Sequence, residues 1–526
     1  MFSRSLTLAF CFVVLAPALP AVAQQSAWAH LGPHGDLVYK TTPRGDRIPD
    51  FSYAGYMAGG VALPTAPVAE TLNPSGSDDT AALQAALDRT AKAAARSNHP
   101  VALLLAPGDF HLSTTIELRG SNVVLRGSGA DKTTLTLTGE PHLGLRVGPA
   151  SAAGEPEGRL DPKLPSTQAS TTLAPDIYVP NGSLSVRVVN ARLFHPGDTV
   201  LINRPVTPAW LHFMQMDNLI RRGKPEHWVG ANLPTERTLA AVHGNTLTFT
   251  SPLMDDYDPA YGGGTQTTVA RIATPVRIQQ VGIESLHIVA PPRRIALGNP
   301  AFDAITLTAT QDAWVRDIRI DDTTTSITIT DTSQRITIDR VDVVDSVTVT
   351  TPAKPFGFSL GGTQTLVMRS SITGDKIFFA ATQARNQGPN VLLHCTFKGD
   401  TALEPHQRWA TGLLVDNVTV HDGAINLYNR GEMGSGHGWA IAWSVVWNSS
   451  ADTITVQSPP GTINWDIGTT GERVLRPMPV FDNQPKGPDI PQGTVDSPGH
   501  PVIPDSLYLQ QLRDRLGEKA VHAIGW

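Results

Sequence analysis

Short apolar runs separated by turn residues dominate the chain from about residue 100 onwards. The segment 101–105 is continuously apolar, as in a strand buried on both faces, and Pro107 and Gly108 open a turn after it. Between 275 and about 460, a β-rich phrase recurs with starts 21 to 34 residues apart. Such an irregular period is typical of the coils of a parallel β-helix with loops of variable length. The expected strands are 281–288, 315–320, 336–343, 366–372, 391–397, 414–420 and 441–447.

Two segments show a helical period instead. Asp78-Asp79-Thr80 offers an N-cap to 81–95, whose apolar side chains fall on one face, and Pro100 ends this helix. A helix directly before short buried strands suits a solenoid whose open end must be covered. Near the C-terminus, 505–516 is a short amphipathic stretch that we expect to dock as a second cap.

These patterns predict an all-β protein, a right-handed parallel β-helix with an N-terminal capping helix and a small β insertion. In the insertion we expect strands at 185–189, 198–202, 247–250 and 267–272. A β-sandwich or a propeller is the competing fold, although no blade signature is present. The expected segments are a signal peptide (1–23), an N-terminal segment (24–75), the cap helix and first coils (76–149), the insertion (150–272), the main coils (273–474), and a linker with the C-terminal helix (475–526).

The first residues have the pattern of a secretory signal. Arg4 gives a positive n-region, 6–19 is a short apolar run, and Ala21 and Ala23 form a small-x-small cleavage site. No later stretch has the ~18 apolar residues that a spanning helix needs. We therefore expect a secreted or periplasmic protein that is free of the membrane after cleavage. Cys395 is the one cysteine after this signal, so no internal disulfide is expected.

Charge and composition narrow the class of partner. The net charge is −6 and only 17% of residues are charged. A nucleic-acid-binding protein would be expected to carry a basic stripe, so we expect no nucleic-acid partner. A glycan remains compatible with these numbers. They do not indicate an oligomeric state.

Two stretches resemble a known family. Gly76-Ser-Asp-Asp-Thr-Ala-Ala-Leu-Gln-Ala-Ala86 and Leu104-Leu-Ala-Pro-Gly-Asp-Phe-His111 are similar to the opening of the pectate-lyase superfamily, where they form the capping helix and the first coil. The resemblance implies a β-helix that acts on an extracellular polysaccharide. It does not select the reaction, because the superfamily is similar to lyases, glycoside hydrolases, fructan-converting enzymes and phage depolymerases alike. No catalytic residue is carried over from it.

The densest group of polar and aromatic residues lies in 385–439. Elimination from a uronate polymer needs a cation for the carboxylate, a base for the C5 proton and an acid for the leaving oxygen. Arg408 or Arg430 could pair with the carboxylate, and His406 or His437 could be the base. Tyr428 could be the acid. This chemistry predicts a polysaccharide lyase.

Further residues of this stretch are candidates for substrate binding. Trp409 and Trp439 could offer flat faces to sugar rings. Gly434, Gly436 and Gly438 indicate unusual backbone angles or the close approach of a ligand. The other candidate binding residues are Asn429, which could instead satisfy backbone groups at a turn, Arg385 and Lys398.

Two other functions stay open. A glycoside hydrolase needs two carboxylates about 5–5.5 or 6.5–9.5 Å apart, and no pair stands out by spacing. The candidates are Asp375, Asp400, Glu404, Asp416, Asp422 and Glu432. A non-catalytic adhesin or glycan-binding solenoid is the other alternative. Calcium-assisted elimination would need converging oxygen ligands, and although Asp342 and Asp345 are neighbours, no ligand pattern surrounds them, so we expect no metal and no cofactor.

Overall fold

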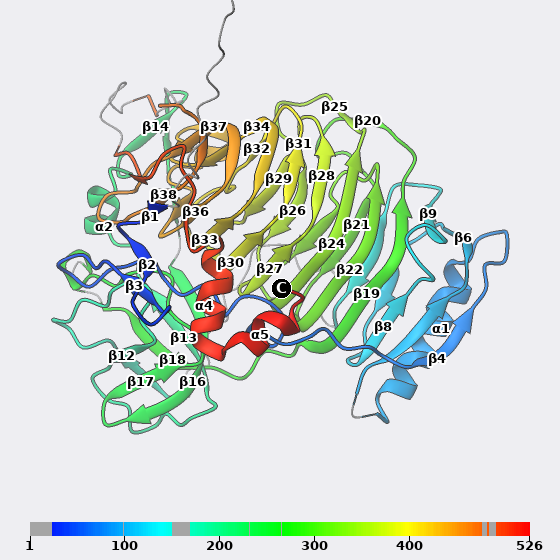
Figure 1. Cartoon of the computed structure of the whole chain (residues 1–526), viewed down its shortest axis with the longest axis horizontal. Helices are drawn as coiled ribbons and strands as arrows, with labels where there is room; N and C mark the ends of the chain where they lie inside the picture. The colour runs from blue at the N-terminus through cyan, green and yellow to red at the C-terminus, as the bar shows by residue number, and fades with distance from the viewer. Residues whose placement is uncertain are drawn as a thin grey trace, which may run out of the picture.

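A parallel β-helix forms the body of the protein (Figure 1). The computed structural model describes residues 24–97, 99–149, 169–230, 232–262, 264, 266–475, 481–482 and 491–526. The signal peptide predicted for 1–23 lies outside these residues, as do parts of the predicted insertion and linker. The central coils of the chain contribute strands to three parallel sheets, which we name A, B and C in the order in which the chain visits them.

Sheets A and B share several long strands that bend from one sheet into the other. These are β19 (Ile278–Val289), β22 (Thr310–Asp321) and β24 (Gln334–Asp345). The other strands of sheet A are β4 (Val68–Leu72), β5 (Val101–Leu105), β8 (Val123–Arg126), β27 (Thr365–Met368), β30 (Gln387–Leu393), β33 (Ala410–Asp416), β35 (Ile441–Ala442), β36 (Val445–Trp447), β38 (Trp465–Ile467) and β40 (Thr494–Asp496). Sheet B adds β6 (Gly108–Leu112), β9 (Thr133–Leu137), β28 (Ser371–Gly374), β31 (Thr396–Lys398), β39 (Thr470–Arg473) and the first parts of β34 (Thr419–Leu427) and β37 (Ser450–Val456).

Sheet C is built from shorter strands. They are β7 (Ile116–Leu118), β10 (Leu143–Val147), β21 (Asp303–Leu307), β23 (Ile327–Ile329), β26 (Phe356–Leu360), β29 (Phe378–Thr382), β32 (Ala402–Leu403) and the second parts of β34 and β37. The recurring phrase seen in the sequence corresponds to the A and B strands of successive coils. The parallel β-helix prediction is therefore confirmed, and sheet C is the part that the phrase did not reveal.

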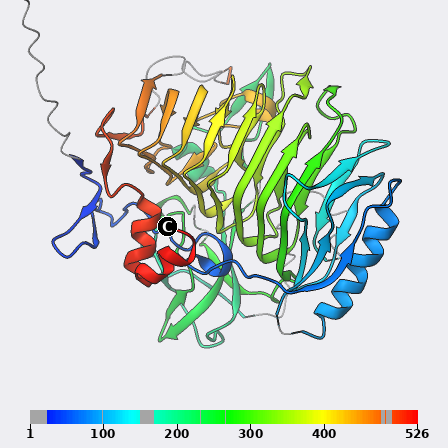
Figure 2. The same cartoon turned by 45° about the vertical axis from the view of Figure 1, so that its right-hand side comes forward.

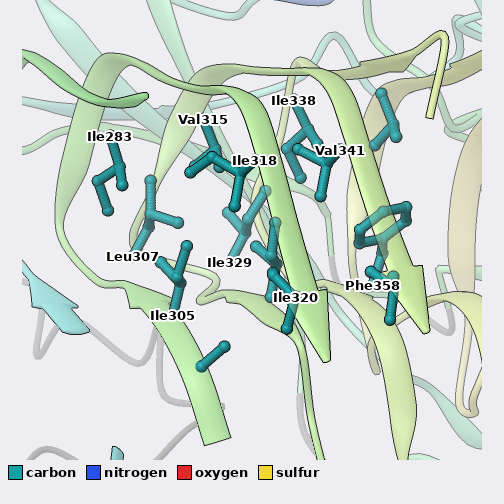
Figure 3. Close-up of a cluster of buried hydrophobic side chains, with 14 of the residues drawn as sticks. Ile283, Ile305, Leu307, Val315, Ile318, Ile320, Ile329, Ile338, Val341 and Phe358 are labelled. Atoms are coloured by element: carbon teal, nitrogen blue, oxygen red, sulfur yellow. The ribbon is translucent and has the colours of Figure 1, made fainter. Parts of the chain in front are cut away.

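The interior is filled by ladders of aliphatic side chains in register. Ile283, Val315 and Ile338 are direct partners on β19, β22 and β24, and all three are buried (Figure 3). Leu307 and Ile329 form a similar step on sheet C. β-Branched residues suit these positions because their stiff side chains pack well on a pleated surface. At about 1.5–3 kcal/mol for each fully buried side chain, such ladders dominate the favourable burial energy of the coil.

The helix α1 (Thr80–Ala94) covers the first coil, as the sequence predicts (Figure 1). Its buried face, with Leu83, Ala86 and Leu87, belongs to the same core cluster as the interior of the β-helix. The apolar end of the solenoid is thereby removed from water, and the first strands meet a helix instead of a neighbouring chain.

The C-terminal helices take a different place from the one predicted. α4 (Leu507–Leu516) and α5 (Glu518–Ala523) lie against the outer face of sheet A, and do not cap the last coil (Figures 1 and 2). Asp416 of β33 fixes α4, because its Oδ2 accepts hydrogen bonds from Ser506 Oγ and the Tyr508 amide, both 2.8 Å away. The apolar stripe of α4 therefore packs on the side of the coil.

The main sheet of the insertion between β10 and β19 is a small antiparallel unit at the lower left of Figure 1. Its sheet order is β11-β18-β13-β16-β17-β12, and a bridge between Leu173 and Val188 joins the two edge strands, so the sheet closes on itself. The strands are β11 (Ser170–Thr172), β12 (Ser185–Arg187), β13 (Thr199–Arg204), β16 (Leu233–His243), β17 (Thr246–Phe249) and β18 (Thr268–Arg271). Four of them match the predicted strands, and β11 and β16 were not predicted. None of the helices in the described part of the chain has the length and apolarity to cross a membrane.

Candidate active site

Four of the predicted site residues lie together on the turns that lead from sheet C to sheet A. His406 follows β32, and its ring lies 4.9 Å from the ring of His437, centre to centre. Arg430, which follows β34, donates from Nη1 to the His406 carbonyl at 2.5 Å. The amide of Arg408 donates to the His437 carbonyl at 3.1 Å. Residues spread over 32 positions, from 406 to 437, thus occupy neighbouring turns of two successive coils.

The backbone of these turns explains their unusual residues. Arg408 and Trp409 have φ angles of 54° and 66°, in the left-handed region. Gly434 has φ 56°, and a Cβ at this position would lie 2.2 Å from Nε2 of His437. The predicted close approach at this glycine is therefore made by the protein's own imidazole, whose Nε2 edge lies against Gly434.

His406 is held as a neutral imidazole with a defined tautomer. Its Nδ1 lies 2.8 Å from Oε1 of Gln383, and Nε2 of Gln383 donates to Ser359 Oγ at 2.9 Å. The amide oxygen needs a donor, so Nδ1 carries the proton and Nε2 holds the lone pair. Burial, together with the positive charges of Arg430 and Arg408, lowers the pKa of His406 to about 4.

His437 shares this electrostatic environment. Burial, Arg430 and His406 lower the pKa of His437 far below its ordinary value. Its side chain is almost fully buried, and Nδ1 has no hydrogen-bond partner among the described residues. His437 therefore packs behind His406 as a neutral ring, and His406 is the more accessible of the two.

The two arginines differ in how far their charges are compensated. Nε of Arg430 lies 2.8 Å from Oε1 of Glu404, and Asn426 donates to the other carboxylate oxygen at 2.8 Å. The Arg430–Glu404 contact is a charge pair whose N–H is not aligned for a hydrogen bond, and both side chains are buried. Arg408 is half-buried and donates to the carbonyl and hydroxyl of Ser435 at 2.8 and 3.0 Å. Burial lowers the pKa of Arg408, an effect that nearby Glu226 opposes.

Two aromatic rings outside the set of predicted site residues complete the site. Phe356 of β26 and Phe378 of β29 are partners in register, half-buried and stacked at 5.6 Å with an angle of 25°. The Phe356 ring lies 5.1 Å from the ring of His406. Lys354 places its ammonium 5.6 Å from the Phe378 ring. These rings, one coil apart on sheet C, form a partly exposed apolar surface beside the imidazole.

Trp409 and Trp439 do not take their predicted role as sugar-stacking faces. Trp409 is fully buried and donates its indole N–H to Asp255 of the insertion at 2.9 Å. Trp439 is 3% exposed and donates to the Met214 carbonyl at 3.2 Å. Both rings fill the interface between the β-helix and the insertion, so neither offers a free face to a sugar.

The side chains of Tyr428 and Asn429 also have structural roles. Tyr428 is 1% exposed, which removes its hydroxyl from any position where it could protonate a bound glycan. Oδ1 of Asn429 accepts a hydrogen bond from the Gly431 amide at 2.8 Å, so this side chain satisfies a turn. The predicted acid and one predicted binding residue are therefore corrected to supporting positions.

Arg385 and Lys398 lie outside the cluster. Arg385 is on the preceding turn and lines a separate cleft between this turn and the insertion, together with Arg237, Arg277 and Glu236. Lys398 is exposed on the outer face of sheet B, paired in register with Thr373 and His421. The two cations thus do not share one binding surface with His406.

The candidate carboxylates of a hydrolase are scattered. Asp416 is buried beside α4, whereas Asp375 and Asp400 are exposed on turns between sheets B and C. Of the six, Glu404 lies within the cluster, and it is paired with Arg430. Among the described residues, no group of three or more His, Cys, Asp or Glu side chains could hold a metal ion.

Comparisons with known proteins give distant structural matches. No protein-family model matches the chain, and no curated protein matches it in sequence. A tailspike protein from Pseudomonas phage LKA1 aligns over 75% of this chain and 69% of its own at 14% identity, with a TM-score of 0.28. A tailspike of E. coli bacteriophage HK620, solved with a pentasaccharide, aligns over 76% and 55% at 11% identity, with a TM-score of 0.37. PfbA, a surface adhesin of Streptococcus pneumoniae, aligns over 78% and 79% at 9% identity, also with a TM-score of 0.37.

Proposed function

We propose that this protein is an exported polysaccharide lyase that cleaves a uronate-containing glycan by β-elimination at the cluster of His406 and Arg408. The observation that carries the proposal is the tautomer of His406. Gln383 contacts Nδ1, which leaves the Nε2 lone pair free of this bond, and the half-buried guanidinium of Arg408 is near enough for its charge to lower the pKa of His406. A base next to a carboxylate-binding cation is the pair that elimination requires.

The reaction can be written with these two side chains. Arg408 binds the uronate carboxylate and withdraws charge from it, which makes the C5 proton more acidic. Nε2 of His406 removes that proton, the C–H electrons form the C4–C5 double bond, and the bond from C4 to the glycosidic oxygen breaks. The imidazolium then returns its proton to the departing oxygen. One residue thereby serves as base and acid, which replaces the predicted role of Tyr428.

The lowered pKa of His406 is compatible with both roles. A bound carboxylate brings a negative charge next to the imidazole, and an opposite charge nearby favours the protonated form. We therefore expect substrate to raise the pKa of His406 from about 4, which strengthens it as a base. Once protonated, the ring is a good acid toward the leaving oxygen, because burial still disfavours its charge.

The geometry favours elimination over hydrolysis. Acid–base hydrolysis requires two carboxyl groups that face each other across the scissile bond. Glu404 is buried and paired with Arg430 and Asn426, and a second, free carboxylate facing it would be needed. A non-catalytic glycan-binding protein is the second candidate. The partly exposed Phe356–Phe378 pair favours it, because such a pair could hold a sugar ring without any turnover.

The test is a panel of uronate and neutral glycans incubated with the purified protein. Elimination yields an unsaturated uronate that absorbs in the ultraviolet, and we expect this absorbance to rise with a uronate polymer. His406→Ala and Arg408→Ala should each lower the rate by about 10²–10⁴-fold. His421→Ala is the matched control, because His421 is exposed on sheet B, away from the cluster.

Three outcomes separate the candidates. Ultraviolet absorbance that depends on His406 and Arg408 supports the lyase. New reducing ends without that absorbance would identify a hydrolase. Saturable binding to a glycan with neither signal, lost in Phe378→Ala but kept in His406→Ala, would identify a binding protein.

A further inference from the structure

A pocket in the insertion is built separately from the candidate active site. It measures about 220 Å³ and lies where the ends of β11, β13 and β18 meet the short helices α2 (Pro208–Phe213) and η3 (Pro259–Tyr261). Its lining includes Trp210, Tyr257, Tyr261, Ile177, Arg204 and Asp258. The lining therefore combines aromatic rings with two charged side chains.

The aromatic rings that line this pocket are fixed by contacts with neighbouring residues. The Tyr261 ring stacks on Phe213 of α2, with centres 4.0 Å apart and an angle of 15°. The Tyr261 carbonyl accepts a hydrogen bond from the Thr207 hydroxyl, which ties η3 to the N-cap of α2. Tyr257 is buried and its hydroxyl donates to Thr235 at 3.4 Å. A fixed aromatic wall lowers the entropy cost of binding a flat apolar face.

Both charges at the pocket are compensated within the protein. Nη1 of Arg204 donates to Asp255 at 2.7 Å, and Asp258 accepts from Nη2 of Arg44 at 2.6 Å. An additional charged ligand would find neither an unpaired cation nor an unpaired anion here. The Asp258 carboxylate accepts bonds from Arg44 and from the Ala260 amide, and a carboxylate has about four lone-pair sites, so it can also accept from a ligand hydroxyl.

We propose that this pocket binds one neutral sugar ring, as an accessory subsite for the glycan whose uronate residues are cleaved at the His406 site. The choice of a sugar rests on the proposed function. The pocket supplies what a neutral pyranose needs: the partly exposed ring of Tyr261 for its C–H face, balanced charge, and an acceptor for its hydroxyl groups. The substrate class is thereby refined to a heteropolymer that carries neutral sugars next to uronates.

The experiment measures binding and cleavage separately on the full-length protein. Neutral hexoses and N-acetylhexosamines, with glucuronate and galacturonate as charged probes, are titrated by saturation-transfer NMR and calorimetry. We expect saturable binding of at least one neutral sugar and weaker binding of both uronates. Tyr261→Ala should weaken it by about tenfold or more, in the range of an aromatic contact with its burial. Ile177→Glu, which places a charge at an exposed lining position, should weaken it by a similar factor.

Tyr53→Ala is the matched control, since this half-buried ring lies against Arg515 in the N-terminal segment, away from both the pocket and the His406 cluster, and should leave binding of the neutral sugar unchanged. The inference is overturned if no neutral sugar binds, if the binding that Tyr261→Ala weakens is tighter for the uronates than for the neutral sugars, or if both pocket variants bind like the natural protein. Failure of the lyase proposal has a different signature. In that case neutral-sugar binding stays sensitive to Tyr261→Ala, while no uronate polymer yields ultraviolet absorbance.

Discussion

Sheets A and C both carry aromatic residues outside the β-helix interior, but these residues have different surroundings. On sheet A, Trp443, Trp447 and Trp465 are fully buried beneath the insertion, the N-terminal segment and the C-terminal helices. On sheet C, Phe356 and Phe378 stay half-exposed beside His406. An outward-facing aromatic residue on a β-helix is therefore part of the core where other segments of the chain cover it. Where no segment covers it, the ring can serve as a binding surface.

The polar groups of the two faces follow the same division. Beneath the insertion, Asp255 and Asp256 accept the indole N–H groups of Trp409 and Trp443, at 2.9 and 3.1 Å. Burial and the neighbouring Asp255 raise the pKa of Asp256 to about 7. On sheet C, His406 instead keeps its Nε2 lone pair. Carboxylates thus serve packing on the covered face, while the imidazole of His406 on the open face is the base that we propose.

The largest expected effect comes from the covered face. Trp409→Ala should lower the free energy of unfolding by about 3–5 kcal/mol, because it leaves a cavity beside Trp210 and Trp228 and removes a donor from buried Asp255. Urea denaturation measures this loss. Phe378→Ala on the open face is the comparison and should cost less than about 1 kcal/mol in stability. Equal losses in the two variants would contradict the division into covered and open faces.

A somewhat smaller effect is expected within the cluster itself. Glu404→Gln leaves the buried guanidinium of Arg430 without its counter-charge, which should cost about 2–4 kcal/mol of stability. Thermal and urea denaturation measure this cost, with the half-exposed Glu432→Gln as control. If Glu404→Gln abolished cleavage of a glycan while stability was unchanged, Glu404 would be an acid or base of a hydrolase, and the lyase proposal would be wrong.

The sequence predicted the coil better than it predicted the site. The strands of sheets A and B are long enough for their apolar pattern to recur visibly along the sequence, and the cap helix has a clear amphipathic period. Sheet C strands such as β32, with two residues, are too short to show a period. Phe356 and Phe378 begin β26 and β29, ahead of the stretch 385–439 in which the polar residues gather, so they were not selected. Trp409 was misplaced for a related reason. Its neighbour Asp255 lies 154 residues away in the insertion, and no local pattern reports such a contact.

The histidines should make stability depend on pH in a defined direction. The pKa of His406 is about 4 in the folded protein, against an ordinary value of 6.5, so the unfolded chain binds a proton first as pH falls. The contribution of His406 to the free energy of unfolding is therefore fully present above about pH 6.5. It falls by about 1–3 kcal/mol as pH decreases toward 4. Urea midpoints at both ends of this range measure the loss.

His406→Gln should remove this part of the acid sensitivity, so the natural protein should lose more stability than the variant between about pH 6.5 and pH 4. His421→Gln, on the exposed face of sheet B, is the control and should leave the pH dependence as it is. A pH dependence that is the same in all three proteins would mean that His406 is not held neutral by its surroundings.

The smallest effect is expected on binding at the open face. Phe378→Ala removes half of the stacked pair, and we expect KM for the cleaved glycan to rise about 3–10-fold, in the range of a single aromatic contact. kcat should change little, because His406 keeps its bond to Gln383. Initial rates over a range of glycan concentrations separate the two constants. A fall in kcat with unchanged KM would instead mean that Phe378 supports the position of His406 through Phe356, and the open face would then be an extension of the catalytic packing without a sugar-binding role.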